Sequence, residues 1–380
     1  MRQRVAIIGT GIAGMACARS LSDQFDLTIL EKNDYFGGHT NTVMVREGSK
    51  EIPIDTGFMV YNKATYPHLV RLFDELKVET AETDMSFGVQ NLEENLEYAC
   101  SGLNTFFAQR RNALHPSQWM LLTEILRFFK VAESYLTSGY DQTETLQAFL
   151  DQNRFKPVFI ENYLLPMTAA IWSTPPGQML DYPAKALLGF LKNHQLLGVG
   201  IQLKWRTVKG GSQSYRDKLL QPLQGCLRKN SRVEGVREKE NQMEIKFRNG
   251  MRENFDFVVI AAHADQALGM LECPTHHQER LLGAFRYTTS PVVLHSDESV
   301  MPKNRRAWAS WNFRMERNAD GQSLASTHYW MNRLQKVSRE KNYFISVNYD
   351  GKIDPEKIHW DYTYEHPTFT AESIAAQKEL

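Results

Sequence analysis

The sequence predicts an α/β fold in which a parallel sheet with a crossover β-hairpin is interrupted by an inserted, mixed but mainly helical domain. Three observations support this prediction. A strand–helix–strand pattern opens the chain over residues 4–31, helical segments broken by prolines fill residues 104–200, and short β segments return over residues 231–262. Alternating strand and helix patterns at the start of a chain are typical of a parallel sheet.

The N-terminal pattern is a βαβ unit. Residues 4–8 (Arg-Val-Ala-Ile-Ile) read as a buried parallel strand, residues 12–22 as a helix and residues 26–31 as a second strand. The stretch 66–77 places its leucines and phenylalanine on one face of a helix. We therefore expect a further helix after the βαβ unit.

The later segments predict a hairpin that leads back to the first sheet. Residues 231–238 and 242–247 read as its two strands, and Asn249-Gly250 as a turn. The apolar run 255–262 is then expected to form one strand that rejoins the parallel sheet.

These patterns predict two interleaved domains and a tail. We expect residues 1–95 and 203–275 to form the discontinuous first domain, and residues 96–202 and 276–345 to form a substrate domain. Residues 346–380 are expected to return toward the first domain as a C-terminal tail.

Composition excludes several classes of protein. Lys+Arg and Asp+Glu both number 44, so the chain of 380 residues has no net charge to attract nucleic acid. No apolar run approaches the ~20 residues of a transmembrane helix. The chain enters a strand directly after its first residues, leaving no room for a signal peptide, which predicts a cytoplasmic protein. Cysteines and histidines lack the spacing of a metal site.

A glycine-rich run between the first strand and the first helix predicts a Rossmann-like dinucleotide site. The run is Gly9-Thr-Gly11-Ile12-Ala13-Gly14. The first glycine permits a tight turn, the second lets the backbone approach a pyrophosphate, and the third lets the helix pack closely on the strand. Ile12 and Ala13 begin the helix, whose N-terminus supplies N–H donors to an anion.

Glu31 stands at the end of the second strand, where an acidic side chain accepts hydrogen bonds from a ribose. Its negative charge disfavours the 2′-phosphate of NADP. Lys32, directly after it, is included in the expected site. FAD and NAD share this fingerprint, so both remain open at this point.

A second glycine pair, Gly37-Gly38, follows six residues after the ribose acid and precedes His39. This arrangement resembles the flavoprotein superfamily of amine oxidases and phytoene desaturases, where the pair continues phosphate and ribitol binding. The resemblance implies FAD as the cofactor. Many relatives have an arginine where this chain has His39.

Further runs resemble one bacterial and plant branch of that superfamily, commonly described as flavin amine oxidases of cyclopropane or related fatty-acid synthesis. The resemblance covers nearly all of the chain. The runs are residues 55–62, 171–175, 208–212, 258–268, 307–312 and 329–335.

The resemblance also implies additional cofactor contacts. Val233 is expected to meet the adenine, and Thr56 and Gly57 to lie near the flavin. Asp55 has an alternative interpretation, as a hydrogen-bond acceptor within its own loop. Relatives continue into a last strand and a glycine-containing helix start that faces the flavin ring, whereas this sequence stops at Leu380. A shortened chain or weakened flavin binding would explain this difference.

The resulting hypothesis is an FAD-dependent oxidoreductase that takes a hydride from an apolar, fatty-acyl or lipid substrate. The pattern assigns no catalytic residue. Two alternatives stay open: an amine oxidase acting on a small amine, and a non-catalytic nucleotide-binding accessory protein. An amine oxidase would need an aromatic cage and a lysine near the flavin. Lys204 and Lys209 are instead expected to lie on the solvated surface.

Two apolar features have alternative interpretations. Residues 119–130 read as a core helix, although Arg127 and Lys130 would also suit peripheral contact with a membrane. Several aromatic residues suit either the wall of an apolar substrate channel or ordinary packing. They are Trp172, Trp308, Trp311, Tyr329 and Trp330.

Overall fold

The computed structural model describes most of the chain. The side chain of Trp172 and residues 173–175 lie outside the described residues, so the run 171–175 is not described in full. The described residues are 2–137, 144–172, 176–198, 203–317, 323–368 and 370–380.

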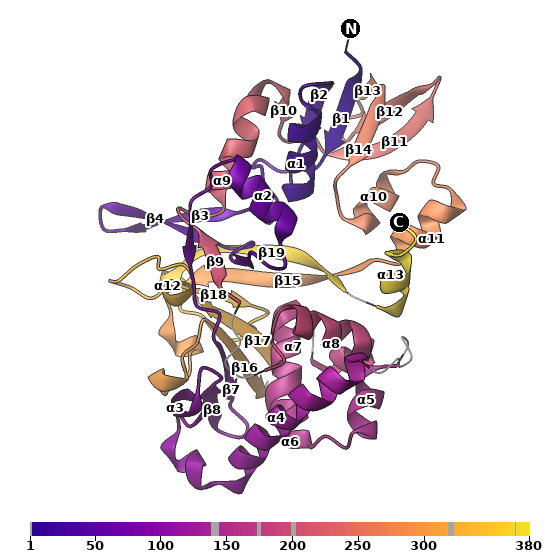
Figure 1. The fold of residues 1–380 in the computed structure, drawn as a ribbon. Coiled ribbons are helices and arrows are strands. Elements are labelled where there is room, and N and C mark those ends of the chain that lie inside the picture. The colour runs from indigo at the N-terminus through magenta and orange to yellow at the C-terminus, as the bar shows by residue number, and fades with distance from the viewer. Residues whose placement is uncertain (1, 138–143, 173–175, 199–202, 318–322, 369) are drawn as a thin grey trace.

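A four-stranded parallel sheet in the order β10-β2-β1-β14 forms one end of the molecule (Figure 1). It confirms the predicted βαβ unit, because the first helix, α1, connects β1 to β2 beside it. Ala6 and Ile7 of β1 are fully buried, as expected for a strand covered on both faces. The elements are β1 (Arg4–Ile8), α1 (Ile12–Leu21), β2 (Asp26–Leu30), β10 (Leu227–Arg228) and β14 (Phe257–Ile260).

The predicted hairpin is part of a three-stranded antiparallel sheet formed by β11 (Val233–Lys239), β12 (Gln242–Phe247) and β13 (Arg252–Phe255). The strand expected over residues 255–262 is present as the shorter β14, which rejoins the parallel sheet beside β1 as predicted, whereas Phe255 ends β13 instead. Gly250 reverses the chain at a φ of +85°, so the residues after it pair with β12 before β14 joins β1.

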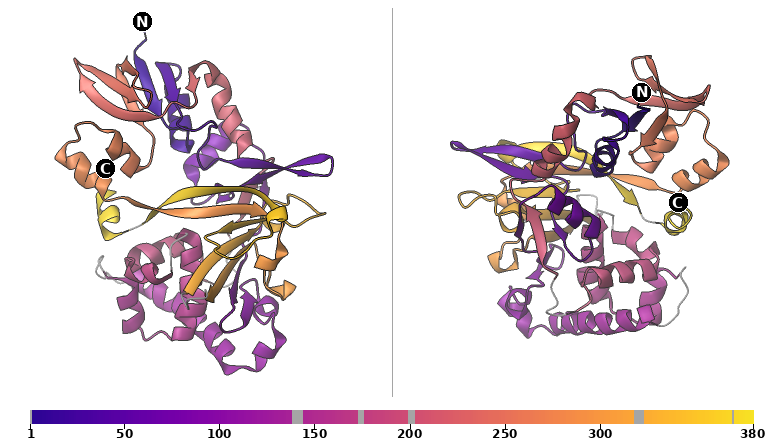
Figure 2. Two further views of the ribbon diagram at one scale, coloured as in Figure 1. Left: turned by 180° about the vertical axis from the view of Figure 1, so that it is seen from behind. Right: turned by 45° about the horizontal axis from the view of Figure 1, so that its top comes forward.

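A seven-stranded mixed sheet lies between the parallel sheet and the helices (Figure 1). Its order is β19-β15-β18-β17-β16-β7-β8. Strands β15 and β19 form a long antiparallel ribbon that crosses the middle of the molecule (Figure 2). The strands are β7 (Phe87–Asn91), β8 (Leu96–Ala99), β15 (Arg286–His295), β16 (Trp311–Arg317), β17 (Ser323–Trp330), β18 (Phe344–Val347) and β19 (Ile358–Thr368).

The inserted helices pack against the β7–β8 end of this sheet around a core rich in phenylalanine and leucine. Phe128, Phe149 and Phe159 are fully buried there, and Phe87 and Met315 of the sheet pack against the same core. The helices are α3 (Leu103–Phe106), α4 (Pro116–Thr137), α5 (Leu146–Gln152), α6 (Pro157–Phe159), α7 (Leu165–Trp172) and α8 (Ala184–Asn193).

The remaining elements connect these layers. The predicted helix at 66–77 is present as α2 (Pro67–Glu75). The other connecting elements are β3 (Thr42–Glu47), β4 (Lys50–Asp55), β5 (Tyr61–Asn62), β6 (Thr80–Glu82), β9 (Trp205–Val208), α9 (Gln213–Leu220), α10 (Ala264–Met270), α11 (His276–Gly283), α12 (Met331–Leu334) and α13 (Ala371–Ala376).

Two of the predicted domain boundaries, at residues 95/96 and 345/346, can be compared with the strand pairing. The boundary at residues 95 and 96 lies in the turn between β7 and β8, which pair with each other. The predicted tail, residues 346–380, contributes β19 to the seven-stranded sheet, and α13 at its end contacts α11. Within the described part of the chain, no helix combines the length and the apolar character that crossing a bilayer requires.

Candidate functional site

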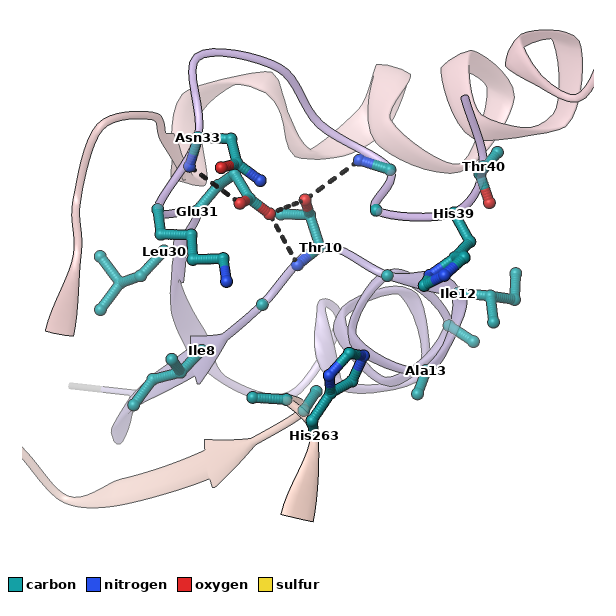
Figure 3. Close-up of a pocket in the computed structure, with 18 of the residues that line it drawn as sticks. Ile8, Thr10, Ile12, Ala13, Leu30, Glu31, Asn33, His39, Thr40 and His263 are labelled. Atoms are coloured by element: carbon teal, nitrogen blue, oxygen red, sulfur yellow. Dashed lines mark hydrogen bonds between the residues drawn. The ribbon is translucent and has the colours of Figure 1, made fainter. Parts of the chain in front are cut away.

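A cavity of about 2040 Å³ opens at the carboxyl ends of β1 and β2 (Figure 3). Carboxyl ends of parallel strands are the usual position of a ligand in such sheets. Its wall also includes residues 37–40, residues 231–234, the residues after β14, and residues 362–365 of β19. The cavity is therefore bounded both by the parallel sheet and by the seven-stranded sheet.

The three glycines of the first motif have different surroundings. A Cβ on Gly9, whose φ is +104°, would lie 2.4 Å from the carbonyl oxygen of Ala261, and a Cβ on Gly14 would lie 2.0 Å from that of Gly9. No atom lies within 4 Å of a Cβ built on Gly11. Gly9 and Gly11 line the cavity, whereas Gly14 lies behind them and permits close packing.

The start of α1 faces the same space. Ile12 and Ala13 line the cavity, and no side chain caps the helix at Gly11. The N–H groups of a first helical turn have no partner within the helix. They are therefore suited to bind an anionic group such as a pyrophosphate.

Glu31 directly follows β2 and is held in place by its neighbours (Figure 3). The Thr10 backbone N–H donates to Oε2 at 3.2 Å, and the Thr10 hydroxyl donates to the same oxygen. The Asn33 N–H donates to Oε1 at 3.0 Å. Lys32, beside it, is exposed and also lines the cavity. The carboxylate is thus fixed at one end of the cavity with lone pairs left for a ligand.

Thr10 is a site residue that the sequence interpretation missed. It is fully buried, and its hydroxyl oxygen also accepts a hydrogen bond from the Gly37 N–H at 3.1 Å. Thr10 therefore links the first glycine motif both to Glu31 and to the second glycine pair. The sequence signal that could have identified Thr10 was its polar side chain between the motif glycines Gly9 and Gly11.

The second glycine pair forms a left-handed turn. Gly37 and Gly38 have φ values of +121° and +58°, and both line the cavity together with His39. Gly57 supports this turn from behind, because its Cβ would lie 2.3 Å from the carbonyl oxygen of His39. Thr56 and Gly57 do not line the cavity, although the Thr56 hydroxyl is 3.0 Å from the Tyr364 hydroxyl, which belongs to its wall.

His39 belongs to a cluster of rings in the cavity wall. It stacks on Tyr364 at a centroid distance of 4.6 Å and lies 5.5 Å from His366 and 6.3 Å from His263. Burial, and then the charges of His366 and His263, lower the pKa of His39 to about 4. Its buried Nε2 has no hydrogen-bond partner among the described residues. A neutral imidazole therefore presents an unsatisfied nitrogen at this wall.

His263 and Glu365 extend the cluster. The His263 ring stacks on Tyr287 at 4.4 Å, and its Nδ1 lies 3.5 Å from Oε2 of Glu365. The Gln266 amide donates to the same oxygen at 2.8 Å. Sequence reasoning did not assign these residues to the site, because only the β15–β19 pairing brings Glu365 to the cavity. The position of His263 just after an apolar strand was the available signal.

Val233 begins β11 at the Glu31 end of the cavity and lines it while only 8% exposed. The backbone N–H of Ser231 donates to the carbonyl oxygen of Glu31 at 2.7 Å. This bond places the start of β11 beside the end of β2. Val233 is thus close to the acidic residue expected to bind the ribose.

Asp55 does not line the cavity. Its Oδ1 accepts hydrogen bonds from the Ser212 N–H and hydroxyl, both at 2.8 Å, and from the Thr42 hydroxyl at 2.6 Å. The Gln335 amide donates to Oδ2 at 2.6 Å. Burial raises the pKa of this carboxyl. Asp55 is thus a hydrogen-bond acceptor within the protein, but its partners Thr42, Ser212 and Gln335 belong to other segments and not to its own loop.

The other sequence candidates lie elsewhere. Lys204 and Lys209 are exposed and form ion pairs with Glu82 and Glu79, at 3.9 Å and 3.2 Å. The aromatic residues Trp308, Trp311, Tyr329 and Trp330 pack in edge-to-face pairs and are not part of the cavity wall.

The residues present fit a flavin dinucleotide. Gly11 leaves open space where a side chain would stand, Glu31 is fixed for a ribose, and His39 offers an unpaired buried nitrogen. The fold and this cavity define a dinucleotide-binding protein. Residues 12–336 match the family described as flavin containing amine oxidoreductase. The chain belongs to this family of FAD-dependent oxidoreductases, and its cofactor is FAD.

Solved structures share the fold. Putrescine oxidase bound to putrescine has a TM-score of 0.65 and 14% identity, covering 92% of this chain and 76% of the oxidase. Cyclohexylamine oxidase from Brevibacterium oxydans has a TM-score of 0.65 and 16% identity, covering 96% of this chain and 85% of the oxidase. A fatty acid isomerase from P. acnes that produces CLA has a TM-score of 0.61 and 14% identity, covering 96% of this chain and 86% of the isomerase.

Among curated proteins, the 15-cis-phytoene desaturase of Synechococcus elongatus is 36% identical over 77 residues. The match covers 20% of this chain and spans only 15% of the desaturase. This short match agrees with the family.

Proposed function

We propose that this chain is an FAD-dependent oxidoreductase that removes a hydride from an apolar, fatty-acyl or other lipid substrate. The observation that carries the proposal is one cavity with Glu31 fixed at one end and a cluster of rings around His39 in its wall. Apolar side chains that also line the cavity, including Phe58, Leu69 and Leu72, suit a substrate of this kind. The runs that resemble the fatty-acid branch support it further.

In this proposal the residues around the cavity bind and orient the cofactor. Bound FAD supplies the hydride acceptor, and the protein positions it and excludes water. The first glycine motif and the start of α1 receive the pyrophosphate, Glu31 receives the ribose, and the adenine lies near the start of β11. The proposed contacts are Gly9, Gly11, Ile12, Ala13, Glu31, Lys32, Gly37, Gly38, His39 and Val233. Gly14, Thr56 and Gly57 support the site from behind the cavity wall and complete the proposed set.

We also propose the division into an FAD domain and a substrate domain, with one refinement. Because β7 and β8 pair with each other and β7 pairs with β16, the first boundary is better placed before Phe87. The substrate domain then contains the inserted helices and the seven-stranded sheet, except for β19 and the end of β18, which the tail 346–380 contributes.

The purified protein tests the proposal directly. We expect a yellow protein with flavin absorbance that is bleached under anaerobic conditions by acylated lipid and not by primary amines or polyamines. Bleaching by amines alone would replace the lipid substrate with an amine. A colourless protein that fails to take up added FAD would instead support an accessory role without catalysis.

A further inference from the structure

The molecule exposes apolar side chains on one corner of the helical region. This α3–α4 corner consists of Leu103 in α3, Leu114 at the end of η1 (Arg110–Leu114), and Trp119, Met120 and Leu126 in α4. Their exposed fractions run from 40% for Leu126 to 87% for Leu114. Figures 1 and 2 place α3 and α4 at the end of the molecule opposite β1.

The exposed face of α4 is distinct from the face that packs in the core, and Trp119 makes contacts within the corner. The opposite face of α4 is already buried, with Leu121 and Phe128 fully inside. The Trp119 indole N–H donates to the carbonyl oxygen of Ala113 at 2.9 Å, and the Trp119 ring lies 4.8 Å from that of Phe107. Clustered exposed apolar side chains of this kind mark interaction sites.

The charge around the corner is positive. Residues 103–137, from the start of α3 to the end of α4, contain Arg110, Arg111, Arg127 and Lys130 against two carboxylates, Glu124 and Glu133, whereas the whole chain has zero net charge. Glu124 is bonded by the guanidinium of Arg127 at 3.0 Å and 2.7 Å. The segment therefore carries a surplus of positive charge.

Carboxylates on the neighbouring β7–β8 turn are also engaged. Glu93 pairs with Arg317 at 2.9 Å, and Glu94 accepts hydrogen bonds from the Asn162 amide at 3.3 Å and 3.1 Å. Trp119, Leu126 and Lys130 share one helical face, since they stand seven and four residues apart. Apolar and aromatic side chains beside cations suit the boundary between acyl chains and anionic headgroups.

We infer that the α3–α4 corner docks on the surface of a bilayer that contains anionic lipids. Leu114, Trp119 and Met120 enter the boundary between headgroups and acyl chains, while Arg110 and Arg111 contact lipid phosphates. The inference goes beyond the proposed redox activity, because it needs only the exposed side chains of this corner and no particular substrate.

Flotation of the full-length, FAD-loaded protein with vesicles tests the inference. We expect binding to vesicles of phosphatidylcholine mixed with phosphatidylglycerol, and much weaker binding to phosphatidylcholine alone. Leu114→Glu, or Arg110→Glu combined with Arg111→Glu, should lower the partition coefficient about tenfold. Met251→Glu is the matched control, because Met251 is 58% exposed beside β13 in the other part of the molecule.

A second readout reports on Trp119 itself. Brominated lipid should quench part of the tryptophan fluorescence, and that part should disappear in Trp119→Phe while flavin absorbance is retained. Absence of binding to anionic vesicles, or equal binding by wild type and Leu114→Glu, would overturn the inference. A dimer in solution that Leu114→Glu dissociates would also overturn it, in favour of contact between two copies of the chain.

Discussion

Gly11 and Gly14 stand in the same motif, yet the structure constrains them for different reasons. A methyl group on Gly11 projects into the cavity without touching protein, whereas one on Gly14 would lie 2.0 Å from the carbonyl oxygen of Gly9. Gly11→Ala should therefore weaken FAD binding about tenfold or more and change the free energy of unfolding of the apoprotein by less than ~1 kcal/mol. Gly14→Ala should instead destabilise the apoprotein by about 1–3 kcal/mol.

Flavin fluorescence titration and urea unfolding of the two apoproteins measure the two effects separately. If Gly11→Ala lowered stability as much as Gly14→Ala while leaving FAD affinity intact, Gly11 would be a packing residue, and the cavity would not hold the pyrophosphate where we place it.

Glu31 provides a second test at this scale. Its two oxygens accept hydrogen bonds from the backbone of Thr10 and Asn33. In Glu31→Gln one of these oxygens becomes an amide nitrogen, which cannot accept, so a buried donor loses its partner at a cost of about 1–3 kcal/mol. We expect both lower stability in urea and weaker FAD binding.

Thr10→Ser is the matched control for Glu31→Gln, because it keeps the hydroxyl that donates to Glu31. It should bind FAD nearly as the wild type does. Equal FAD affinity in wild type and Glu31→Gln would show that this carboxylate does not bind the ribose of FAD.

At the scale of elements, strands β15, β18 and β17 are joined by a buried hydrogen-bonded chain of side chains. The Asp297 N–H donates to Nδ1 of His295 at 3.1 Å, and His295 Nε2 lies 2.7 Å from the Ser346 hydroxyl. That hydroxyl lies 2.6 Å from Nδ1 of His328. Because His295 Nδ1 accepts, its Nε2 carries the proton, and the chain is satisfied with both imidazoles neutral.

This chain should make the sheet sensitive to acid. Burial lowers the pKa of His295 from 6.5 to about 4, and it lowers the pKa of His328 well below its ordinary value. The unfolded chain thus binds more protons than the folded one below pH 6.5, so stability falls as pH drops from 6.5 toward 4, by up to about 1.4 kcal/mol per pH unit for each histidine.

Urea midpoints measured across this pH range check the prediction. His295→Gln cannot titrate there, so its midpoint should fall less steeply with acid than that of the wild type, even where its stability at neutral pH is lower. Parallel slopes for the two proteins would show that other groups, such as carboxylates, govern acid unfolding.

At the scale of the whole molecule, parts of the fold set by neighbouring residues in the sequence could be predicted, whereas parts set by pairing between distant segments could not. Strand, glycine turn, helix and Glu31 all lie within the first 31 residues, so their pattern identifies the dinucleotide site. The seven-stranded sheet depends on distant pairs such as Trp311 with Phe87, for which no local pattern exists. The same long-range pairing brings Tyr364 against His39, and this is why the sequence identified one partner and not the other.

The cavity therefore predicts that FAD joins two distant parts of the chain. Residues 9–13, 37–40 and 231–234 belong to one wall, and residues 362–365 of β19 belong to the other. At a free FAD concentration of ~100 times Kd, binding should add about 2.7 kcal/mol to the free energy of unfolding.

Amide hydrogen exchange with and without FAD locates this effect. Because β19 lines the cavity, we expect added protection in residues 362–365 as well as in the glycine motifs, and none in the α3–α4 corner at the far end of the molecule. Gly11→Ala at the same FAD concentration should show the weaker protection expected from its lower occupancy. Protection confined to residues 9–14 and 231–234 would instead mean that β19 bounds the cavity without contacting the cofactor, and His39 with Tyr364 would then face the substrate.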